Sequence, residues 1–191
     1  MLAMSEATES VLGLLAGYLT HDAAEAADVD RVVALARRVP DPWLRSASLH
    51  LTASALIVAP GTGQVLLRWH QRQQAWLQVG GHGDPGESDA LAIALREAAE
   101  ETGLPDLAAW PDRQLRQVAV VPVPASRSEP AHEHADLRFV LATADPAAAR
   151  PESAHAPLRW LDIDEANALT REDNLRELLA RVRPLLEEAT R

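Results

Sequence analysis

The chain of 191 residues contains no cysteine. It can therefore form no disulfide, carry no thiolate nucleophile and build no zinc–thiolate site. Long hydrophobic runs are also missing, and the apolar stretch Val11–Leu19 is too short to cross a bilayer. Acidic rather than basic residues, Glu6 and Glu9, precede that stretch, which argues against a signal peptide. We therefore expect a cytoplasmic protein with no membrane partner.

Positive charge is scarce. The chain has 18 basic and 28 acidic residues, a formal net charge of −10 and an isoelectric point of about 5.1. This balance argues against a general nucleic-acid surface or an anionic-membrane surface. With 47% apolar residues, the length predicts one domain of ordinary size with a full core, plus an appendage.

The appendage is predicted at the N-terminus. Apolar residues repeat at helical spacing through residues 5–38, and Pro40 and Pro42 are expected to end the second helix. We predict a helical extension over residues 1–42 and a separate domain over residues 43–191. The extension is expected to pack on that domain, and formation of a homodimer or a cover over the active site is the alternative.

The rest of the chain alternates between strands and helices. Strands are predicted over residues 48–57, 64–70, 114–123, 134–143 and 158–161, and helices over 89–102 and 171–188. Residues 76–79 lead into a glycine-rich turn. Ser88 is expected to cap the first of these helices, and Thr170 with Asp173 to start the second. This order predicts an α/β protein with a mixed sheet between helical layers.

The most informative stretch is a glycine-rich turn, Gly80–Glu87, that leads into a helix. Glu97, Glu100 and Glu101 follow on that helix within an arc of about 100°. Each like-charge pair costs about 0.2–0.5 kcal/mol, so the cluster calls for a cation, and a hard dication such as Mg²⁺ or Mn²⁺ fits best. A bare acidic triplet is more often a solvated helix face, but the glycine turn favours a site. An apolar stripe on the opposite side is predicted to pack against the sheet: Leu91, Leu95, Ala98 and Thr102.

These residues resemble the signature of the Nudix hydrolases. The signature is a Gly, five residues, a Glu, seven residues, and then Arg-Glu-apolar-x-Glu-Glu-x-Gly-apolar. Gly81 and Glu87 match its first part. Its second part is matched by Arg96, Glu97, Ala98, Glu100, Glu101, Gly103 and Leu104. Eight residues, not seven, separate Glu87 from Arg96, so either the turn bulges by one residue or Ser88 takes the place of the first Glu.

The resemblance implies a Nudix-type α/β/α sandwich that hydrolyses a nucleoside diphosphate linked to another group X, with Mg²⁺ or Mn²⁺ as the cofactor. It implies that Glu97, Glu100 and Glu101 bind the metal and that Glu100 or Glu101 also serves as the base. Arg96 is expected to orient the signature turn, which includes Gly81 and Gly86, by pairing with an acid such as Glu87. The alternative is a catalytically inactive Nudix-like nucleotide-binding or regulatory module. The complete glutamate set and the absence of a basic DNA-binding segment favour the enzyme.

Two further groups are candidates for binding the substrate. Arg68, His70 and Arg72 alternate at the end of a predicted strand and could bind phosphate oxygens, although an ordinary basic surface is the alternative. His82 lies in the signature turn, where we expect it to face the substrate or support the turn rather than bind a metal.

His132, His134 and Asp136 share one strand face if the strand extends back to His132. They are expected to border the substrate cleft or to supply the base, with a solvated edge as the alternative. By parity, His134 and Asp136 lie opposite the apolar side chains that follow them. We expect the catalytic helix to pack on the same face as His134 and Asp136.

Overall fold

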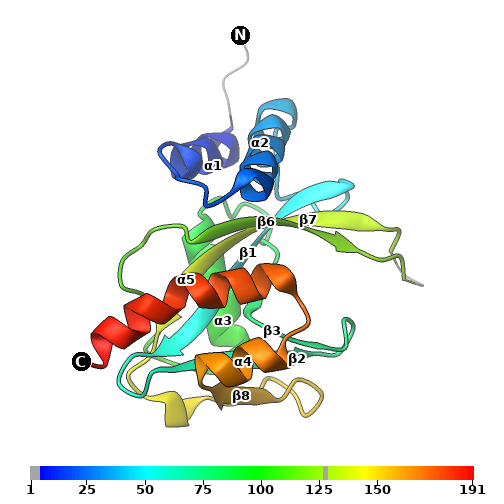
Figure 1. The fold of residues 1–191 in the computed structure, drawn as a ribbon. Coiled ribbons are helices and arrows are strands. Elements are labelled where there is room, and N and C mark those ends of the chain that lie inside the picture. Colours follow the sequence, from blue (N-terminus) through cyan, green and yellow to red (C-terminus); the bar gives the residue numbers. More distant parts are fainter. Residues whose placement is uncertain (1–4, 127–128) are drawn as a thin grey trace.

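The computed structural model describes residues 5–126 and 129–191. An eight-stranded mixed sheet lies between helices on its two faces (Figure 1). The strands are β1 (Leu49–Ala59), β2 (Gln64–His70), β3 (Ala75–Leu77), β4 (Val79–Gly81), β5 (Ala108–Ala109), β6 (Gln117–Val123), β7 (His132–Ala142) and β8 (Leu158–Leu161). The helices are α1 (Glu6–Leu15), α2 (Ala23–Arg38), α3 (Ala90–Thr102), α4 (Ile163–Leu169) and α5 (Asp173–Ala189), with a 3₁₀ turn, η1 (Pro146–Ala148).

The central strands β1 and β7 are parallel, in a register that places His50 opposite His134. All other pairs among the strands within residues 5–126 and 129–191 are antiparallel. One edge of β1 is shared, because β4 pairs with Ala53–Ala55 and β2 pairs with the following residues 57–59. The sheet therefore opens along β1, and β4 brings the signature turn to that opening.

Two hydrophobic clusters cover the two faces of the sheet. Leu137, Phe139 and Leu141 of β7 pack in one cluster with α1, α2 and α3. Val140 of β7 packs in the other with α4 and α5. Because both faces are covered, β1 is buried along nearly its whole length. The predicted mixed sheet between helical layers is confirmed. Within the described ranges, no helix is both long and apolar enough to span a membrane.

Two predicted helix starts are wrong. Asp89, not Ser88, caps α3, because its carboxylate accepts hydrogen bonds from the amides of Leu91 and Ala92. Thr170 and Asp173 do not form a cap for α5, whose N-cap Glu172 makes no side-chain hydrogen bond.

Helix α4 was not predicted. It begins with a capping box in which Asp162 and Glu165 each bond the other's backbone amide. The capping box is a start signal that the sequence contained. A helix of seven residues is too short to show a clear hydrophobic periodicity, so α4 was missed.

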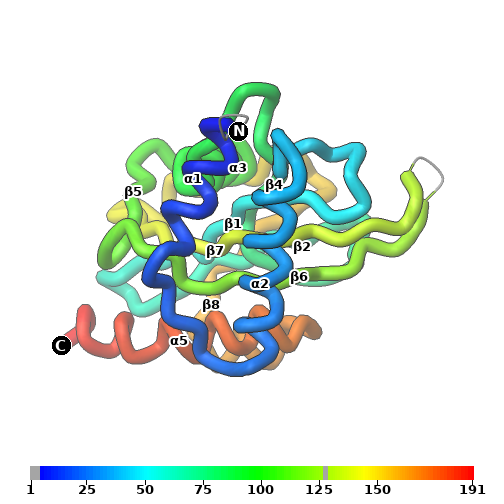
Figure 2. Tube along the Cα trace, turned by 90° about the horizontal axis from the view of Figure 1, so that it is seen from above, coloured from blue at the N-terminus to red at the C-terminus, as the bar shows by residue number. Residues whose placement is uncertain are grey.

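The two predicted N-terminal helices are present as α1 and α2, which lie side by side over the sheet (Figure 2). Helix α2 closes the edge of β6, which pairs with β7 alone among the described strands. Glu25 accepts a hydrogen bond from the Val118 amide at 3.0 Å, and Asp28 accepts one from the Val120 amide at 2.8 Å. These bonds satisfy strand amides that would otherwise be unpaired.

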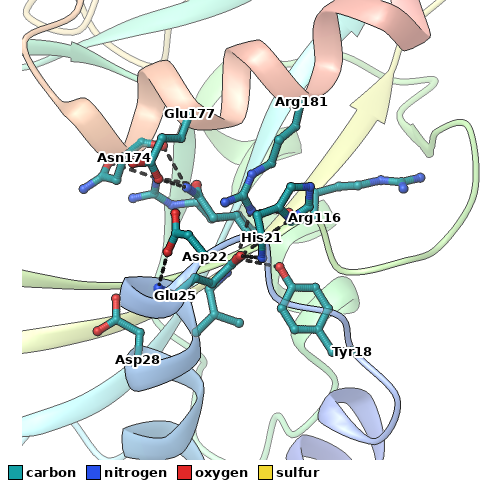
Figure 3. A network of polar contacts seen from close by, with 12 residues as sticks. Tyr18, His21, Asp22, Glu25, Asp28, Arg116, Asn174, Glu177 and Arg181 are labelled. Atoms are coloured by element: carbon teal, nitrogen blue, oxygen red, sulfur yellow. Dashed lines mark hydrogen bonds and ion pairs between the residues drawn. The ribbon is translucent and has the colours of Figure 1, made fainter.

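Glu25 also joins the helices to α5. It pairs with Arg181 at 2.8 Å and accepts a hydrogen bond from the Tyr18 hydroxyl at 2.6 Å (Figure 3). Glu25 is 4% exposed and Arg181 is 10% exposed. The extension thus shares the core and a buried ion pair with the rest of the chain, and its boundary at residue 42 stays a prediction.

Candidate active site

Helix α3 holds the three glutamates of the signature against the sheet. Its predicted apolar stripe is confirmed, since Leu91, Ala98 and Thr102 are buried and Leu95 packs against the same core. The helix ends at Gly103, whose φ of 64° forms a left-handed C-cap. Packing on one side therefore fixes the direction in which the glutamates point on the other.

Glu97 and Glu101 face strand β4. A Cβ atom on Gly81 would lie 2.6 Å from the carboxyl group of Glu97, so only glycine leaves that carboxylate its present place. Glu101 accepts a hydrogen bond from the Gly80 amide at 3.0 Å and lies 3.3 Å from the Arg68 guanidinium. The side chains of Glu97 and Glu101 are 16% and 12% exposed, whereas that of Glu100 is 58% exposed.

Burial governs the ionisation of these two acids. It raises the pKa of Glu97 even though Arg96 lies beside it. Burial also raises the pKa of Glu101 to about 7, against the opposing effects of Arg68 and the Gly80 amide. A raised carboxyl pKa means that the neighbouring positive charge does not fully compensate the carboxylate.

Arg96 connects the signature turn to the helix. Its Nε and Nη2 atoms donate to the two carboxylate oxygens of Glu87 at 3.0 and 2.8 Å, and Nη2 also donates to the His82 carbonyl at 2.9 Å. Its Nη1 atom lies 3.0 Å from Glu97 and 3.3 Å from Glu100. The contact expected between Glu87 and Arg96 is therefore present, and the turn accommodates its extra residue before Arg96.

Glu87 also closes the signature turn through a hydrogen bond with the backbone. Glu87 accepts a hydrogen bond from the Asp84 amide at 2.8 Å, and Gly86 between them has a φ of 92° that favours glycine. The hydrogen bond from Arg96 is the main cause of the lowered pKa of Glu87. Glu87 thus remains ionised and supports the turn.

A polar cavity lies on the other face of β4. Its lining includes these residues: Thr52, Ser54, His70, Gln78, Gly80, Gly81, His82, His134, Asp136, Arg138 and Asn174. Asp136 accepts hydrogen bonds from Thr52 at 3.0 Å, Ser54 at 2.8 Å and Arg138 at 2.8 Å. The buried Oε1 atom of Gln78 has no hydrogen-bond partner, which leaves an acceptor available beside the cavity.

The expectation that α3 shares a face with His134 and Asp136 is wrong. Arg138, two residues after Asp136, donates to Asn174 of α5 at 3.0 Å, while α3 packs on the opposite face. The glutamates of α3 and the polar cavity instead lie on opposite sides of β4. Gly80 and Gly81 line the cavity and contact Glu101 and Glu97 from the other side.

Arg68 and His70 of β2 and Arg72 after it lie in three different surroundings. Arg68 pairs with Glu101 and, at 2.5 Å, with Glu152. His70 lines the cavity, and burial is the main cause of its lowered pKa. Arg72 lies on the surface and pairs with Glu129 at 2.6 Å. They do not form one phosphate-binding row, and only Arg68 reaches the glutamates.

Four histidines gather at one end of the cavity. Strand β7 begins at His132, two residues before the predicted start, so His132 and His134 share a face. His82 and His50 join them, and ring centroids within this group lie 4.8–5.3 Å apart. Sequence reasoning missed His50, because only the parallel pairing of β1 with β7 places it opposite His134.

Burial keeps the rings of His50, His82 and His134 neutral near pH 7. Together with the neighbouring His134 ring, it lowers the pKa of His82 to about 3. Burial and the neighbouring His50 ring lower the pKa of His134 to about 4. Burial also lowers the pKa of His50. Uncharged imidazoles can accept hydrogen bonds or bind metals.

Comparison with known proteins places this chain in a family. The family described as the NUDIX domain matches residues 48–182. No curated protein matches the chain.

Solved structures with the same fold include a C. elegans Ap4A hydrolase in a binary complex, with 19% identity, coverage of 72% of this chain and 98% of that chain, and a TM-score of 0.57. The E. coli dihydroneopterin triphosphate pyrophosphohydrolase has 21% identity, coverage of 69% and 92%, and a TM-score of 0.52. A NUDIX family hydrolase from Clostridium perfringens has 22% identity, coverage of 73% and 97%, and a TM-score of 0.52. The chain belongs to the Nudix family of hydrolases.

Proposed function

We propose that this protein is a metal-dependent hydrolase that cleaves a phosphoanhydride bond in a nucleoside diphosphate linked to a group X. The observation that carries the proposal is the position of Glu97 and Glu101 beside a glycine strand that also forms the wall of a polar cavity. A diphosphate bound along that strand reaches the acids and the cavity together.

The glutamates fit a hard dication such as Mg²⁺ or Mn²⁺. Carboxylate oxygens are the ligands that such ions prefer. Burial raises the pKa of Glu97 and of Glu101 despite the nearby arginines, so a bound dication would stabilise ionised forms that burial disfavours. Glu100 is exposed enough to turn toward the same ion. When bound, the dication neutralises the diphosphate and lowers the pKa of a water molecule.

The chain's own residues position the acids and move the proton. Arg96 holds Glu87 and Glu97, and Arg68 holds Glu101. Glu101 is our first choice for the general base, because the Gly80 amide and Arg68 hold its carboxylate at the strand that forms the cavity wall. Glu100 is the second choice, since it lies one residue away and is more exposed.

We assign the nucleoside or X portion of the substrate to the polar cavity. His70, His82 and His134 offer imidazoles there, and Asp136 forms part of its lining. The unpartnered Gln78 carbonyl oxygen would accept a hydrogen bond from an N–H or O–H group of the ligand. Arg72 is left out of this site, because it is held by Glu129 on the surface.

A substrate panel tests the proposal. Sugar nucleotides, coenzyme-like dinucleotides, oxidised nucleotides, diadenosine tetraphosphate and dihydroneopterin triphosphate are incubated with Mg²⁺ and either the wild type or Glu101→Gln. The products are separated by chromatography. We expect cleavage of at least one compound by the wild type and strong loss in the variant. Tight binding of a nucleotide without turnover of any compound would instead support the regulatory-module alternative.

We also propose that the protein acts in the cytoplasm on small nucleotides, with no nucleic-acid or membrane partner. The formal net charge of −10 and the lack of cysteine support this assignment. A homodimer is the corresponding proposal for its oligomeric state, and light scattering of the purified protein tests it by measuring the molar mass in solution.

A further inference from the structure

We propose that His50, His82 and His134 form a binding site for an imidazole-preferring divalent metal of the Zn²⁺ class, separate from the glutamate site. One potential ligand atom from each of the three side chains lies within 4.8 Å of the others. This site goes beyond the proposed hydrolysis. Its imidazole ligands suit Zn²⁺, Co²⁺ and Ni²⁺ better than Mg²⁺.

The ring of His50 is oriented for this role. Its Nδ1 atom lies 2.9 Å from the Ala47 carbonyl oxygen, so Nδ1 carries the proton and donates it. The Nε2 atom then keeps its lone pair, which points at His82. A carbonyl that fixes the tautomer of a buried histidine in this way is the usual support of a metal-binding imidazole.

The spacing between nitrogens suits a shared ion. The Nε2 atoms of His50 and His82 lie 3.1 Å apart, and two imidazole nitrogens on a tetrahedral Zn²⁺ with bonds of 2.0–2.1 Å are separated by roughly 3.3 Å. In the metal-free chain His82 donates its Nε2 proton to His50. Binding through the same atom moves that proton to Nδ1 of His82, which leaves the ring neutral.

His132 supports the third ligand from outside. Its Nδ1 atom lies 2.9 Å from the Pro130 carbonyl oxygen, and its Nε2 atom lies 3.1 Å from Nε2 of His134. His132 is therefore a positioning residue for His134. Because His82 and His134 also line the polar cavity, an ion held by three histidines keeps an open position toward that cavity.

Strand pairing holds the three ligands in fixed positions. His50 and His134 are directly opposed in the parallel pair β1 and β7. His82 follows β4, which pairs with β1, and Arg96 binds the carbonyl of His82 at 2.9 Å. Sites positioned by strands are more precise than sites positioned by loops alone.

Cobalt titration of the full-length, tag-free protein tests this site. The carboxylates are first silenced by Glu97→Gln, Glu100→Gln and Glu101→Gln. Co²⁺ binding is followed by its visible d–d absorption, and Zn²⁺ stoichiometry is measured by calorimetry. We expect one equivalent of each metal, bound through nitrogen ligands. His134→Gln and His82→Gln, each added to this background, should weaken binding at least about 10–100-fold.

His155→Gln is the matched control, because His155 is exposed and outside the cluster, and it should leave Co²⁺ binding unchanged. Circular dichroism identifies any variant that fails to fold, and the other variant then decides. Absence of Co²⁺ and Zn²⁺ binding to the silenced protein overturns the proposal, as does full binding in folded His82→Gln or His134→Gln. The titration contains no substrate. Its result is therefore independent of the proposed hydrolysis, and either proposal can be rejected without rejecting the other.

Discussion

The guanidinium of Arg68 lies 3.3 Å from the carboxylate of Glu101, yet burial still raises the pKa of Glu101 to about 7. A single arginine therefore does not offset the loss of water around this acid. The same arginine pairs with Glu152, so its charge is shared between two carboxylates. The ionised form of Glu101 therefore has only part of one positive charge to stabilise it.

The proposed binding of a dication at Glu101 should depend on pH. Below about pH 7 Glu101 holds a proton in the metal-free protein, and a metal must displace it. Mg²⁺ affinity should therefore fall as the pH drops below 7, by up to about tenfold per pH unit. Calorimetric titrations with Mg²⁺ across this range measure the trend. Glu101→Gln should weaken it, and the remainder reflects Glu97, whose pKa is also raised. An Mg²⁺ affinity that stays constant between about pH 5 and 8 would reject Glu101 as a ligand with this pKa.

Glu87 and Glu100 both contact Arg96 but are expected to differ in function. Glu100→Gln should lower kcat at least about 100-fold, the scale of a lost acid–base or metal contribution. Glu87→Gln should mainly loosen the turn, at a cost of about 1 kcal/mol for a partly exposed pair, and lower kcat less than tenfold. Steady-state kinetics and urea unfolding separate the two effects. Glu188→Gln, at an exposed position in α5, is the control. Equal kcat losses for Glu87→Gln and Glu100→Gln would contradict the distinction.

Gly81→Ala should harm activity more than stability. The added Cβ would meet the carboxyl group of Glu97 at 2.6 Å, and a flexible side chain moves aside more easily than backbone. We expect kcat to fall at least about tenfold, with a change in unfolding free energy of less than about 1 kcal/mol. Gly13→Ala, where no atom lies within 4 Å of the new Cβ, is the control and should keep full activity. Normal kinetics in Gly81→Ala would show that the position of Glu97 is not critical.

The attachment of the N-terminal helices should be sensitive to acid. Burial alone would raise the pKa of Glu25, but hydrogen bonds from Arg181, Tyr18 and two amides outweigh it and lower the pKa to about 2. A folded-state pKa below the ordinary value of 4.5 means stabilisation that is present above about pH 4.5 and lost as the pH falls toward 2.

Glu25→Gln should therefore cost about 3 kcal/mol at neutral pH, since it leaves Arg181 buried without its partner. Urea unfolding at several pH values measures the difference from the wild type, which should shrink as the pH falls below about 4.5. Asp30→Asn, at an exposed position on the same helix, is the matched control. A difference that stays the same down to about pH 3 would contradict the role of the ionised Glu25.

The sequence predicted what is encoded locally. The turn, the helix and the three glutamates lie within one continuous segment, so the predicted apolar stripe of α3 and the contact between Glu87 and Arg96 were both found in place. The prediction failed where two neighbouring residues could each cap the same helix. Asp89 is the N-cap of α3, not Ser88, because its carboxylate accepts hydrogen bonds from two amides.

Relationships set by long-range pairing were not predictable. His50 meets His134 only because β1 and β7 pair in parallel across more than 80 positions of sequence. The face that α3 covers depends on the same pairing, so parity alone could not place His134 relative to α3. Arg68 alternates with His70 on one strand, but its partner Glu101 comes from a different element.

Metal dependence is the most direct test of the proposed function. Turnover of the best compound in the substrate panel is measured with protein stripped by EDTA and then dialysed, before and after addition of Mg²⁺ or Mn²⁺. The clustered glutamates predict no detectable hydrolysis in the stripped protein and full recovery with either ion. Undiminished turnover in metal-free protein would contradict the proposed role of Glu97, Glu100 and Glu101.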